Sequence, residues 1–148
     1  EFTMEAKSWS RTVKTFKTNK AGCVSNTPFL KTLKLKIGCD VVLVHNLDTL
    51  DGLTNGCRGK LVDVEISGGK VHRLVVEFDN PDHGRLARMR NPCKKHPKGT
   101  YIDRINWTYM LGGATAQVCQ FPLKGAAAMT GHKIQVSIEM ITLIISSN

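Results

Sequence analysis

Cysteine and histidine are the residue types in this chain that could bind a metal or act as nucleophiles, and their spacing decides between these uses. The five cysteines are widely and irregularly spaced, and no CxxC pair occurs. Cys93 and His96 are separated like a pair of zinc ligands, and His83 with Cys119 could complete a tetrahedral site. Nothing in the spacing ties the second pair to the first. Reduced thiols in a non-secreted protein are therefore the favoured interpretation, with zinc as the alternative.

The sequence lacks the common nucleotide-binding and hydrolase motifs. The Gly-Lys pairs that begin at Gly59 and Gly69 are followed by Leu and Val, so neither belongs to the GxxxxGK(S/T) loop that cradles phosphates. The GxSxG, HExxH and GxGxxG patterns are also absent. Asp79 and Asp82 flank an Asn-Pro dipeptide and are expected to be turn residues, not a catalytic pair. We therefore expect neither catalytic residues nor a bound cofactor in these 148 residues.

Charge is the clearest chemical signal, with 21 Lys and Arg against 12 Asp and Glu and a net charge of +9. The balance is +6 over residues 1–38, −4 over 39–82, +6 over 83–104 and +1 over 105–148. Two basic blocks around an acidic centre suit the neutralisation of nucleic-acid phosphates, and a solvated basic face is the alternative. Pro92 and Pro97 interrupt the second block, which is therefore expected to be a long loop.

The elements that must position these charges are predicted to be mostly strands. Residues 41–44 form a continuous apolar run, residues 60–66 and 71–78 alternate around a Ser-Gly-Gly-Lys turn, and residues 101–111 and 115–121 flank a Gly-Gly pair. Four or five short strands of this kind predict a small barrel or sandwich. The residues predicted to face its interior are Val42, Val44, Val62, Val64, Leu74, Val76 and Phe78.

After Pro122 the pattern changes to that of a helix. Apolar or small residues recur at helical spacing, namely Leu123, Ala126, Ala127, Thr130 and Ile134. Pro122 suits the first turn of such a helix, where its missing N–H costs no hydrogen bond. Residues 136–145 are rich in Ile, Val and Thr and predict a final strand, too short to span a bilayer. The first residues contain no signal-peptide core and no initiating Met, so we expect a soluble, non-secreted fragment.

Two longer stretches carry a specific signal, LKLKIGCDVVLVHNLDTLDGLTNGCRGKLVDV at residues 33–64 and QFPLKGAAAMTGHKIQ at residues 120–135. In this order they resemble the C-terminal half of PIF-family (petite integration frequency) 5′-to-3′ DNA helicases, which are RecD-like members of helicase superfamily 1B. The family pattern is roughly LKxGAxVMLxxNLDxxxGLxNGxxGxV, followed by FPLxLAxAMTxHKxQGQT. The resemblance covers residues 28–135. The intervening FDNPDHGRLARMR and YIDRINWTYMLGG resemble versions found in animal and mobile-element helicases.

The resemblance implies a mixed α/β, mostly β fold, in which a small Src-homology-3-like β-barrel is inserted in a partial RecA-like domain with one helix after Pro122. Residues 1–35 would be the N-terminal segment of the second RecA-like domain, residues 36–121 the barrel insert, and residues 122–148 the motif V helix and terminal strand. The implied function is that of a C-terminal fragment of an ATP-dependent DNA helicase, which contributes single-stranded DNA contacts and part of the interdomain cleft. ATP and Mg would be cofactors of the intact parent, a nuclear or mitochondrial protein in a eukaryote and otherwise cytoplasmic. Its roles would include DNA repair, DNA recombination and telomere maintenance.

The resemblance also implies a set of DNA-contacting residues. They are Thr130, His132, Lys133 and Gln135 in the motif V region, Asn46 and Arg58 in the first stretch, and Arg88 in the second basic block. Hydroxyl, imidazole and ammonium groups suit a track that must grip phosphates and release them in each cycle. The expected partners are single-stranded DNA and the missing N-terminal RecA-like domain of the parent, with no membrane.

The sequence departs from the family pattern at its C-terminal end. Val136-Ser137-Ile138 replaces Gly-Gln-Thr, and Gly125 and Gly131 stand where larger apolar residues are usual. The arginine-bearing motif VI, the nucleotide-binding loop and the acidic metal motif are absent. We therefore expect a truncated, mis-spliced or decayed helicase gene product that is not self-sufficient for ATP hydrolysis. The alternatives are a stand-alone basic β-barrel that binds nucleic acid, suggested by the turn-and-strand at residues 56–62, and a basic structural protein.

Overall fold

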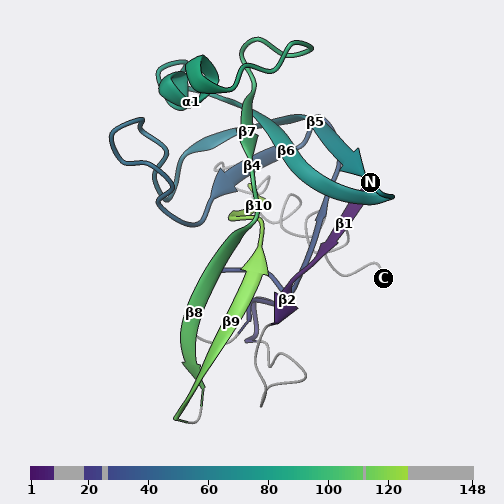
Figure 1. Cartoon of the computed structure of the whole chain (residues 1–148), viewed down its shortest axis with the longest axis vertical. Helices are drawn as coiled ribbons and strands as arrows, with labels where there is room; N and C mark the ends of the chain where they lie inside the picture. The colour runs from purple at the N-terminus through teal and green to yellow at the C-terminus, as the bar shows by residue number, and fades with distance from the viewer. Residues whose placement is uncertain (9–18, 25–26, 112, 127–148) are drawn as a thin grey trace, which may run out of the picture.

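The computed structural model describes residues 1–8, 19–24, 27–111 and 113–126, and this part of the chain is mostly β (Figure 1). Ten strands and one short helix occur in it. All strand pairings among these residues are antiparallel. The expectation of a mostly-β fold is thus confirmed. No helix in the described ranges is long and apolar enough to cross a membrane.

The strands form three sheets. A two-stranded sheet pairs β1 (Phe2–Glu5) with β3 (Thr32–Leu35). A five-stranded sheet has the order β10 (Leu123–Gly125), β4 (Asp40–Leu43), β5 (Arg58–Ser67), β6 (Lys70–Phe78) and β7 (Thr100–Ile102). A three-stranded sheet has the order β2 (Lys7–Ser8), β9 (Ala114–Gln120) and β8 (Ile105–Leu111). Pairing among the described strands does not close them into a barrel.

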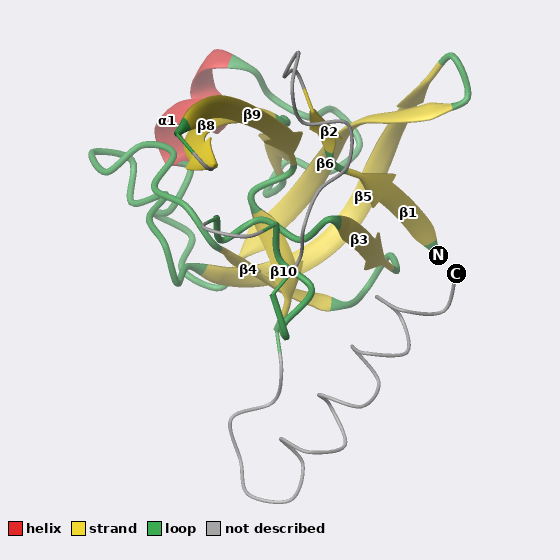
Figure 2. Cartoon of the chain, turned by 90° about the horizontal axis from the view of Figure 1, so that it is seen from below, coloured by secondary structure: helices red, strands yellow, loops and turns green. Residues whose placement is uncertain are grey.

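The arrangement in space separates two ends of the molecule. Figure 1 shows the β8–β9 hairpin extending away from the five-stranded sheet, with α1 (Arg85–Arg90) at the opposite end. The perpendicular view places α1 at the periphery of the strands (Figure 2). The smaller of two hydrophobic cores joins the hairpin to the rest of the fold through Val24, Phe29, Val44, Tyr109, Ala116 and Val118.

The β5–β6 hairpin agrees with the pattern in the sequence. Its turn is made by Gly68 and Gly69, which adopt φ angles of 59° and 76°. These values lie in the left-handed region that favours glycine, as expected for a tight hairpin turn. Leu74, Val76 and Phe78 of β6 are buried, as predicted. The alternation of β6 thus specified the face that enters the larger core, although Val75 on the opposite face is also buried.

The predicted inward faces of β4 and β5 need correction. Val41 and Leu43 of β4 are fully buried, whereas Val42 is half-buried. In β5 the fully buried residue is Leu61, whereas Val62 and Val64 are half-buried. A run of apolar residues without alternation cannot specify which face is inward. In β5 the register also shifts between Leu61 and Asp63, and such a bulge changes the alternation of faces. Val44 just after β4 is buried, as predicted, but in the smaller core.

Two further predictions, one of a helix and one of a loop, also need correction. Directly after Pro122 the chain forms β10, which pairs with β4, so no helix begins there. The remainder of that predicted helix lies outside the described residues. Conversely, the loop predicted for the second basic block contains a helix, α1, at residues 85–90. The acceptors that permit this helix come from a distant loop, as described below.

Gln120, at the end of β9, connects segments that are far apart in the sequence. Its buried Nε2 donates hydrogen bonds to the carbonyl oxygens of Met4 and Leu30, at 2.9 and 3.1 Å. Its Oε1 accepts from the backbone amide of Phe121 at 2.9 Å and from the Arg104 guanidinium at 3.1 Å. A single side-chain amide therefore satisfies backbone groups from three parts of the fold.

Candidate nucleic-acid interface

The loop between β4 and β5 (residues 44–57) carries Asn46, one of the expected DNA-binding residues. The backbone amide of Asn55 donates to Asn46 Oδ1 at 2.7 Å. Within the same loop the amide of Leu50 donates to Asp48 Oδ1 at 3.1 Å. Side chains of this kind commonly bond to nearby backbone groups and fix a turn. Asn46 is exposed, and its carbonyl oxygen serves to fix this loop.

Asp51 connects the same loop to α1. Its carboxylate accepts hydrogen bonds from the amides of Leu86 and Ala87, at 2.8 and 2.9 Å, and the residue is only 4% exposed. The Gly84 amide donates to the Asp51 carbonyl at 2.9 Å. The first amides of a helix have no partner within the helix, and here a carboxylate from another loop accepts from them. This contact explains a helix at residues 85–90 that has no capping side chain of its own.

Arg88, another expected DNA-binding residue, belongs to this assembly. Its guanidinium donates to the carbonyl oxygen of His83 at 2.8 Å, to Thr100 Oγ1 at 3.0 Å and to the carbonyl oxygen of Pro81. The side chain is half-buried. Hydrogen bonds from a charged donor to backbone carbonyls stabilise a loop strongly. Arg88 therefore holds the segment between β6 and α1 against β7.

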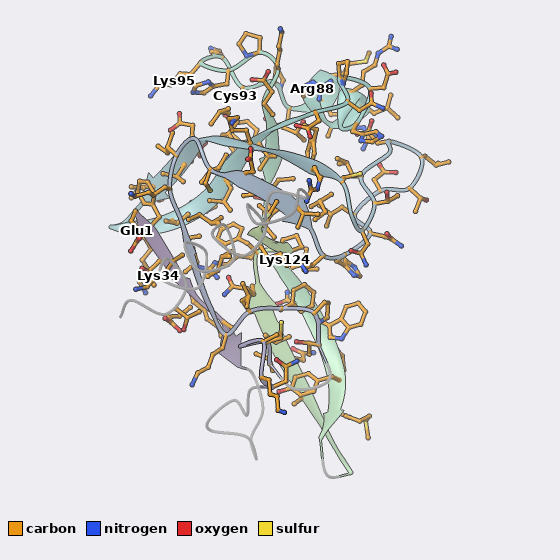
Figure 3. All side chains as sticks on the ribbon, turned by 180° about the vertical axis from the view of Figure 1, so that it is seen from behind. Glu1, Lys34, Arg88, Cys93, Lys95 and Lys124 are labelled. Carbon is orange, nitrogen blue, oxygen red and sulfur yellow. The ribbon has the colours of Figure 1, made fainter. Side chains whose placement is uncertain are left out.

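The residues from α1 to the start of β7, residues 85–98, are here called the basic segment. They contain six Lys and Arg and no Asp or Glu. Five of these cations are exposed, namely Arg85, Arg90, Lys94, Lys95 and Lys98. Figure 3 shows Arg88 and Lys95 at the same end of the molecule. The basic segment thus gathers exposed positive charge at the end opposite the β8–β9 hairpin.

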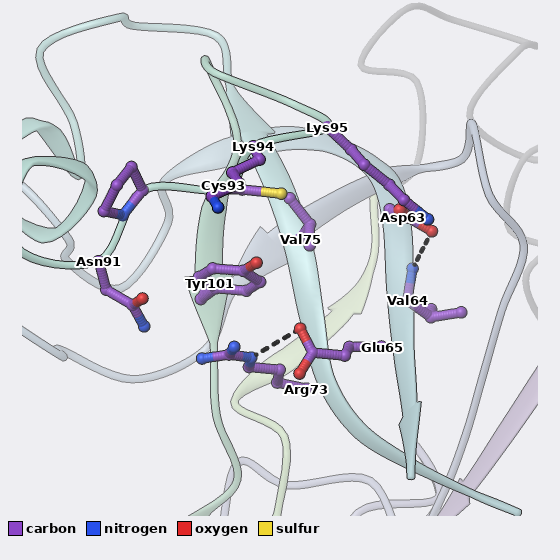
Figure 4. A pocket seen from close by; sticks show the side chains of 11 residues that line it. Asp63, Val64, Glu65, Arg73, Val75, Asn91, Cys93, Lys94, Lys95 and Tyr101 are labelled. Atoms are coloured by element: carbon purple, nitrogen blue, oxygen red, sulfur yellow. Dashed lines mark hydrogen bonds and ion pairs between the residues drawn. The ribbon is translucent and has the colours of Figure 1, made fainter.

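A cavity of about 360 Å³ lies between the basic segment and strands β5, β6 and β7 (Figure 4). Arg73 lies in it with its guanidinium carbon 3.7 Å from the centroid of the Tyr101 ring. Arg73 Nε also donates to Glu65 Oε2 at 3.0 Å, and this bond raises the pKa of the guanidinium. A hydrogen bond with the Cys93 thiol is the main cause that raises the pKa of Tyr101. One side of the cavity is therefore a cation stacked on a neutral phenol.

The histidines considered as zinc ligands have other partners in the structure. His83 Nδ1 lies 3.4 Å from the Cys57 thiol, and His96 Nε2 lies 3.3 Å from Asp63 Oδ2. Among the described residues, no group of three or more His, Cys, Asp or Glu side chains is placed to hold a metal ion.

Arg58 begins β5 beside a second cavity, of about 350 Å³, and is exposed. Asn55 and His83 also line this cavity. Because Asn55 bonds to Asn46 and the His83 carbonyl bonds to Arg88, the structure brings Asn46, Arg58 and Arg88 to one region. The other expected residues, Thr130, His132, Lys133 and Gln135, lie outside the described residues, as does the predicted strand at 136–145.

Two residues important for this region were not identified from the sequence. The dipeptide Asp51-Gly52 is typical of a turn, and the helix that Asp51 caps lies about 35 positions away in the sequence. Gln120 was noted only as part of a motif. The local residue type that is related to this contact is the glycine at position 52. In the structure, a Cβ at Gly52 would lie 2.5 Å from His83 Cδ2. A glycine that permits so close an approach indicates that the two loops pack together.

Comparison with known proteins shows which family the chain resembles. Residues 24–64 match the family model of the DNA helicase Pif1 2B domain. The chain is 33% identical over 112 residues to the ATP-dependent DNA helicase PIF1 of Danio rerio, covering 75% of this chain and 15% of the relative. The human protein of the same name is 35% identical over 109 residues, which are 73% of this chain and 14% of the relative. The chain thus spans about one seventh of the length of these relatives.

Solved structures show the same fold. Unliganded Pif1 from Bacteroides sp aligns with a TM-score of 0.53 and 22% identity, over 90% of this chain and 34% of that one. Pif1 helicase from Candida albicans aligns with a TM-score of 0.51 and 20% identity, over 82% of this chain and 28% of that one. The family model, the helicase relatives and these folds agree with the resemblance noted in the sequence. Together these findings support a PIF1-family helicase fragment with a match to the 2B domain of that family.

Proposed function

We propose that this chain supplies single-stranded DNA contacts within a PIF1-type ATP-dependent DNA helicase. The observation that carries the proposal is the basic segment, with its five exposed cations beside the stacked Arg73 and Tyr101. The relatives matched by sequence are named ATP-dependent DNA helicases. In this proposal ATP, Mg and the unwinding activity belong to the whole helicase, and the chain contributes to the binding of the strand.

The arrangement of domains is part of the same proposal. Residues 36–121 correspond to a Src-homology-3-like insert, and residues 1–35 and 122–148 to portions of the RecA-like domain that surrounds it. Support comes from the 2B-domain match at residues 24–64, which includes all of β4 and most of β5.

The basic segment suits a backbone contact that does not depend on base identity. Lysine and arginine neutralise phosphates and release counterions, so binding through them weakens as salt rises. Phosphate contacts position a nucleic acid without reading its sequence. Arg58 and Asn46 extend this surface, and Arg88 acts by holding it in shape. Thr130, His132, Lys133 and Gln135 remain proposed contacts on the same DNA strand.

Fluorescence anisotropy with a labelled single-stranded oligonucleotide, titrated across a salt series, tests the proposal. The expected result is weak binding whose log–log salt slope is about −0.7 for each phosphate neutralised. Arg90→Ala or Lys94→Ala should each weaken binding about equally for all sequences and make the slope less steep by about 0.7, if each side chain neutralises one phosphate.

Lys70→Ala is the matched control, because it removes one exposed cation at the other end of β6. It should leave both the affinity and the slope nearly unchanged. Equal effects of Lys70→Ala and Arg90→Ala would show that only net charge matters and would contradict a defined surface. Binding that does not depend on salt, or no binding at low salt, would overturn the proposal.

A further inference from the structure

We propose that this chain forms a symmetric dimer by pairing the outer edge of β8 with the β8 edge of a second copy. β8 is an outer strand of its sheet, which has the order β2-β9-β8. Among the residues that the structure describes, β8 pairs with β9 alone. Figure 1 shows the β8–β9 hairpin projecting from the five-stranded sheet. The strand edge is therefore presented away from the main body of the fold.

The composition of β8 is unusual for an exposed edge. Natural proteins protect sheet edges with short strands, charged side chains, prolines or bulges. The other outer strands of the two larger sheets are short, with three residues each in β7 and β10 and two in β2. β8 has seven residues, INWTYML, without a charge, a proline or a glycine. It also pairs with β9 in continuous register, without a bulge.

The strand is complementary to itself when two copies run antiparallel. With the two-fold axis at Thr108, Trp107 lies opposite Tyr109 of the second copy, and Asn106 lies opposite Met110. No like charges meet, and cross-strand pairs of aromatic side chains stabilise antiparallel strands. A closed two-fold interface of this kind uses the same patch on both subunits. The product is a continuous six-stranded sheet with the order β2-β9-β8-β8-β9-β2.

The inward side of this edge is already ordered. Trp107 packs edge-on against His45 and Phe29, with ring centroids 4.8 and 5.8 Å away. Tyr109 is only 6% exposed. Pairing therefore needs little further ordering of side chains, which lowers its entropic cost. Because β8 carries no charge that would select an unlike partner, a second copy is the occupant that we propose.

Sedimentation velocity of the full chain over a range of concentrations tests this pairing. The wild-type chain should show a monomer–dimer equilibrium that persists at high salt. Thr108→Lys places two ammonium groups opposite each other at the axis and should weaken the dimer by at least about tenfold. Gln117→Lys is the control, since Gln117 is exposed on β9 directly opposite Thr108 and therefore lies off the β8 edge that forms the proposed interface. This control should dimerise like the wild type.

Cysteine cross-linking gives a second measurement that does not depend on dimer strength. Directly opposed residues of antiparallel strands have Cα atoms about 4.5–5.5 Å apart, within the range of a disulfide. Thr108→Cys should therefore form a covalent dimer under mild oxidation, beyond the level of the wild-type chain, and Gln117→Cys should not. Circular dichroism of each variant verifies that it folds.

Three results would overturn the proposal. The first is a wild-type chain that stays monomeric in sedimentation and a Thr108→Cys chain that does not cross-link. The second is a dimer that Thr108→Lys leaves intact, and the third is open-ended growth into larger assemblies instead of a closed dimer.

Discussion

Gln120 belongs to the QFPLKG stretch, and its side chain organises backbone groups that no neighbouring residue could satisfy. Its amide bonds to the carbonyl oxygens of Met4 and Leu30 and to the amide of Phe121. Phe121 is fully buried, and the Arg104 guanidinium lies 4.5 Å from its ring centroid. Burial of Arg104 lowers the pKa of its guanidinium. The guanidinium donates hydrogen bonds to Gln120 Oε1 and to the carbonyl oxygen of Glu5. The stretch thus has a structural role at this position.

Gln120→Leu should lower the free energy of unfolding by about 2–4 kcal/mol, because buried carbonyl and amide groups would lose their partners. Urea unfolding followed by circular dichroism measures this. Gln117→Leu, on the same strand but exposed, should change the stability by less than about 0.5 kcal/mol. Similar stability of the two variants would contradict the assigned role.

Single lysines show where charge counting in a sequence fails. Lys34 lies in the first basic block, where it was expected to contact phosphates, but the structure buries it completely. Among the residues that the structure describes, no group forms a hydrogen bond with its ammonium. Lys36, two residues later, is exposed. A pattern of charges every three or four residues predicts neither outcome, because it does not state which elements will cover each position.

At the scale of elements, α1 depends on a loop that precedes it by about 35 residues. Asp51→Ala should destabilise the protein by about 1–2 kcal/mol, because the cap is lost and the first-turn amides lose their acceptors. Hydrogen exchange should then show the amides of Leu86 and Ala87 losing protection, while β5 stays protected.

Asp82→Ala is the control for this prediction, because Asp82 also precedes α1 but is exposed. It should leave the protection of α1 unchanged. If Asp51→Ala left Leu86 and Ala87 protected, the loop would not be what holds the helix.

Three elements, β6, β4 and α1, show how far the sequence can predict this fold. The alternation of β6 and the two glycines of its turn were sufficient for the central hairpin, because both signals are local. The phase of β4 could not be predicted, since the apolar run at residues 41–44 has no alternation and the partner strands on each side decide which of its residues are buried. The helix at residues 85–90 was missed because its capping carboxylate comes from elsewhere in the chain. Asn46 and Arg88 were found as polar positions, but their bonding within the loops depends on tertiary contacts.

At the scale of the whole molecule, positive charge and the free strand edge lie at opposite ends. The basic segment surrounds α1, and the β8–β9 hairpin extends the other way (Figure 1). A dimer through β8 would therefore place two basic segments far apart, each open to its own nucleic acid. The two proposals can fail separately, since one concerns salt-dependent binding and the other a salt-resistant strand pairing.

The 148-residue chain alone should not hydrolyse ATP, with or without single-stranded DNA, because it contains no GxxxxGK(S/T) loop. Phosphate release by the purified chain measures this, and the human ATP-dependent DNA helicase PIF1 serves as the positive control. DNA-stimulated turnover that stays with the protein through repeated purification would contradict the prediction.

The pairing of β10 with β4 has a consequence for biosynthesis. β4 acquires this neighbour only when residues 123–125 have left the ribosome, and the bond from Gln120 to Met4 spans 116 positions. A nascent chain can form the β5–β6 hairpin early, because its pairing is local, but must wait for its last described strand before the sheet is complete. During translation at about 5–20 residues per second, apolar residues of β4 stay uncovered for seconds. A chaperone that binds extended apolar segments would therefore find its target on the incomplete chain and lose it once β10 docks.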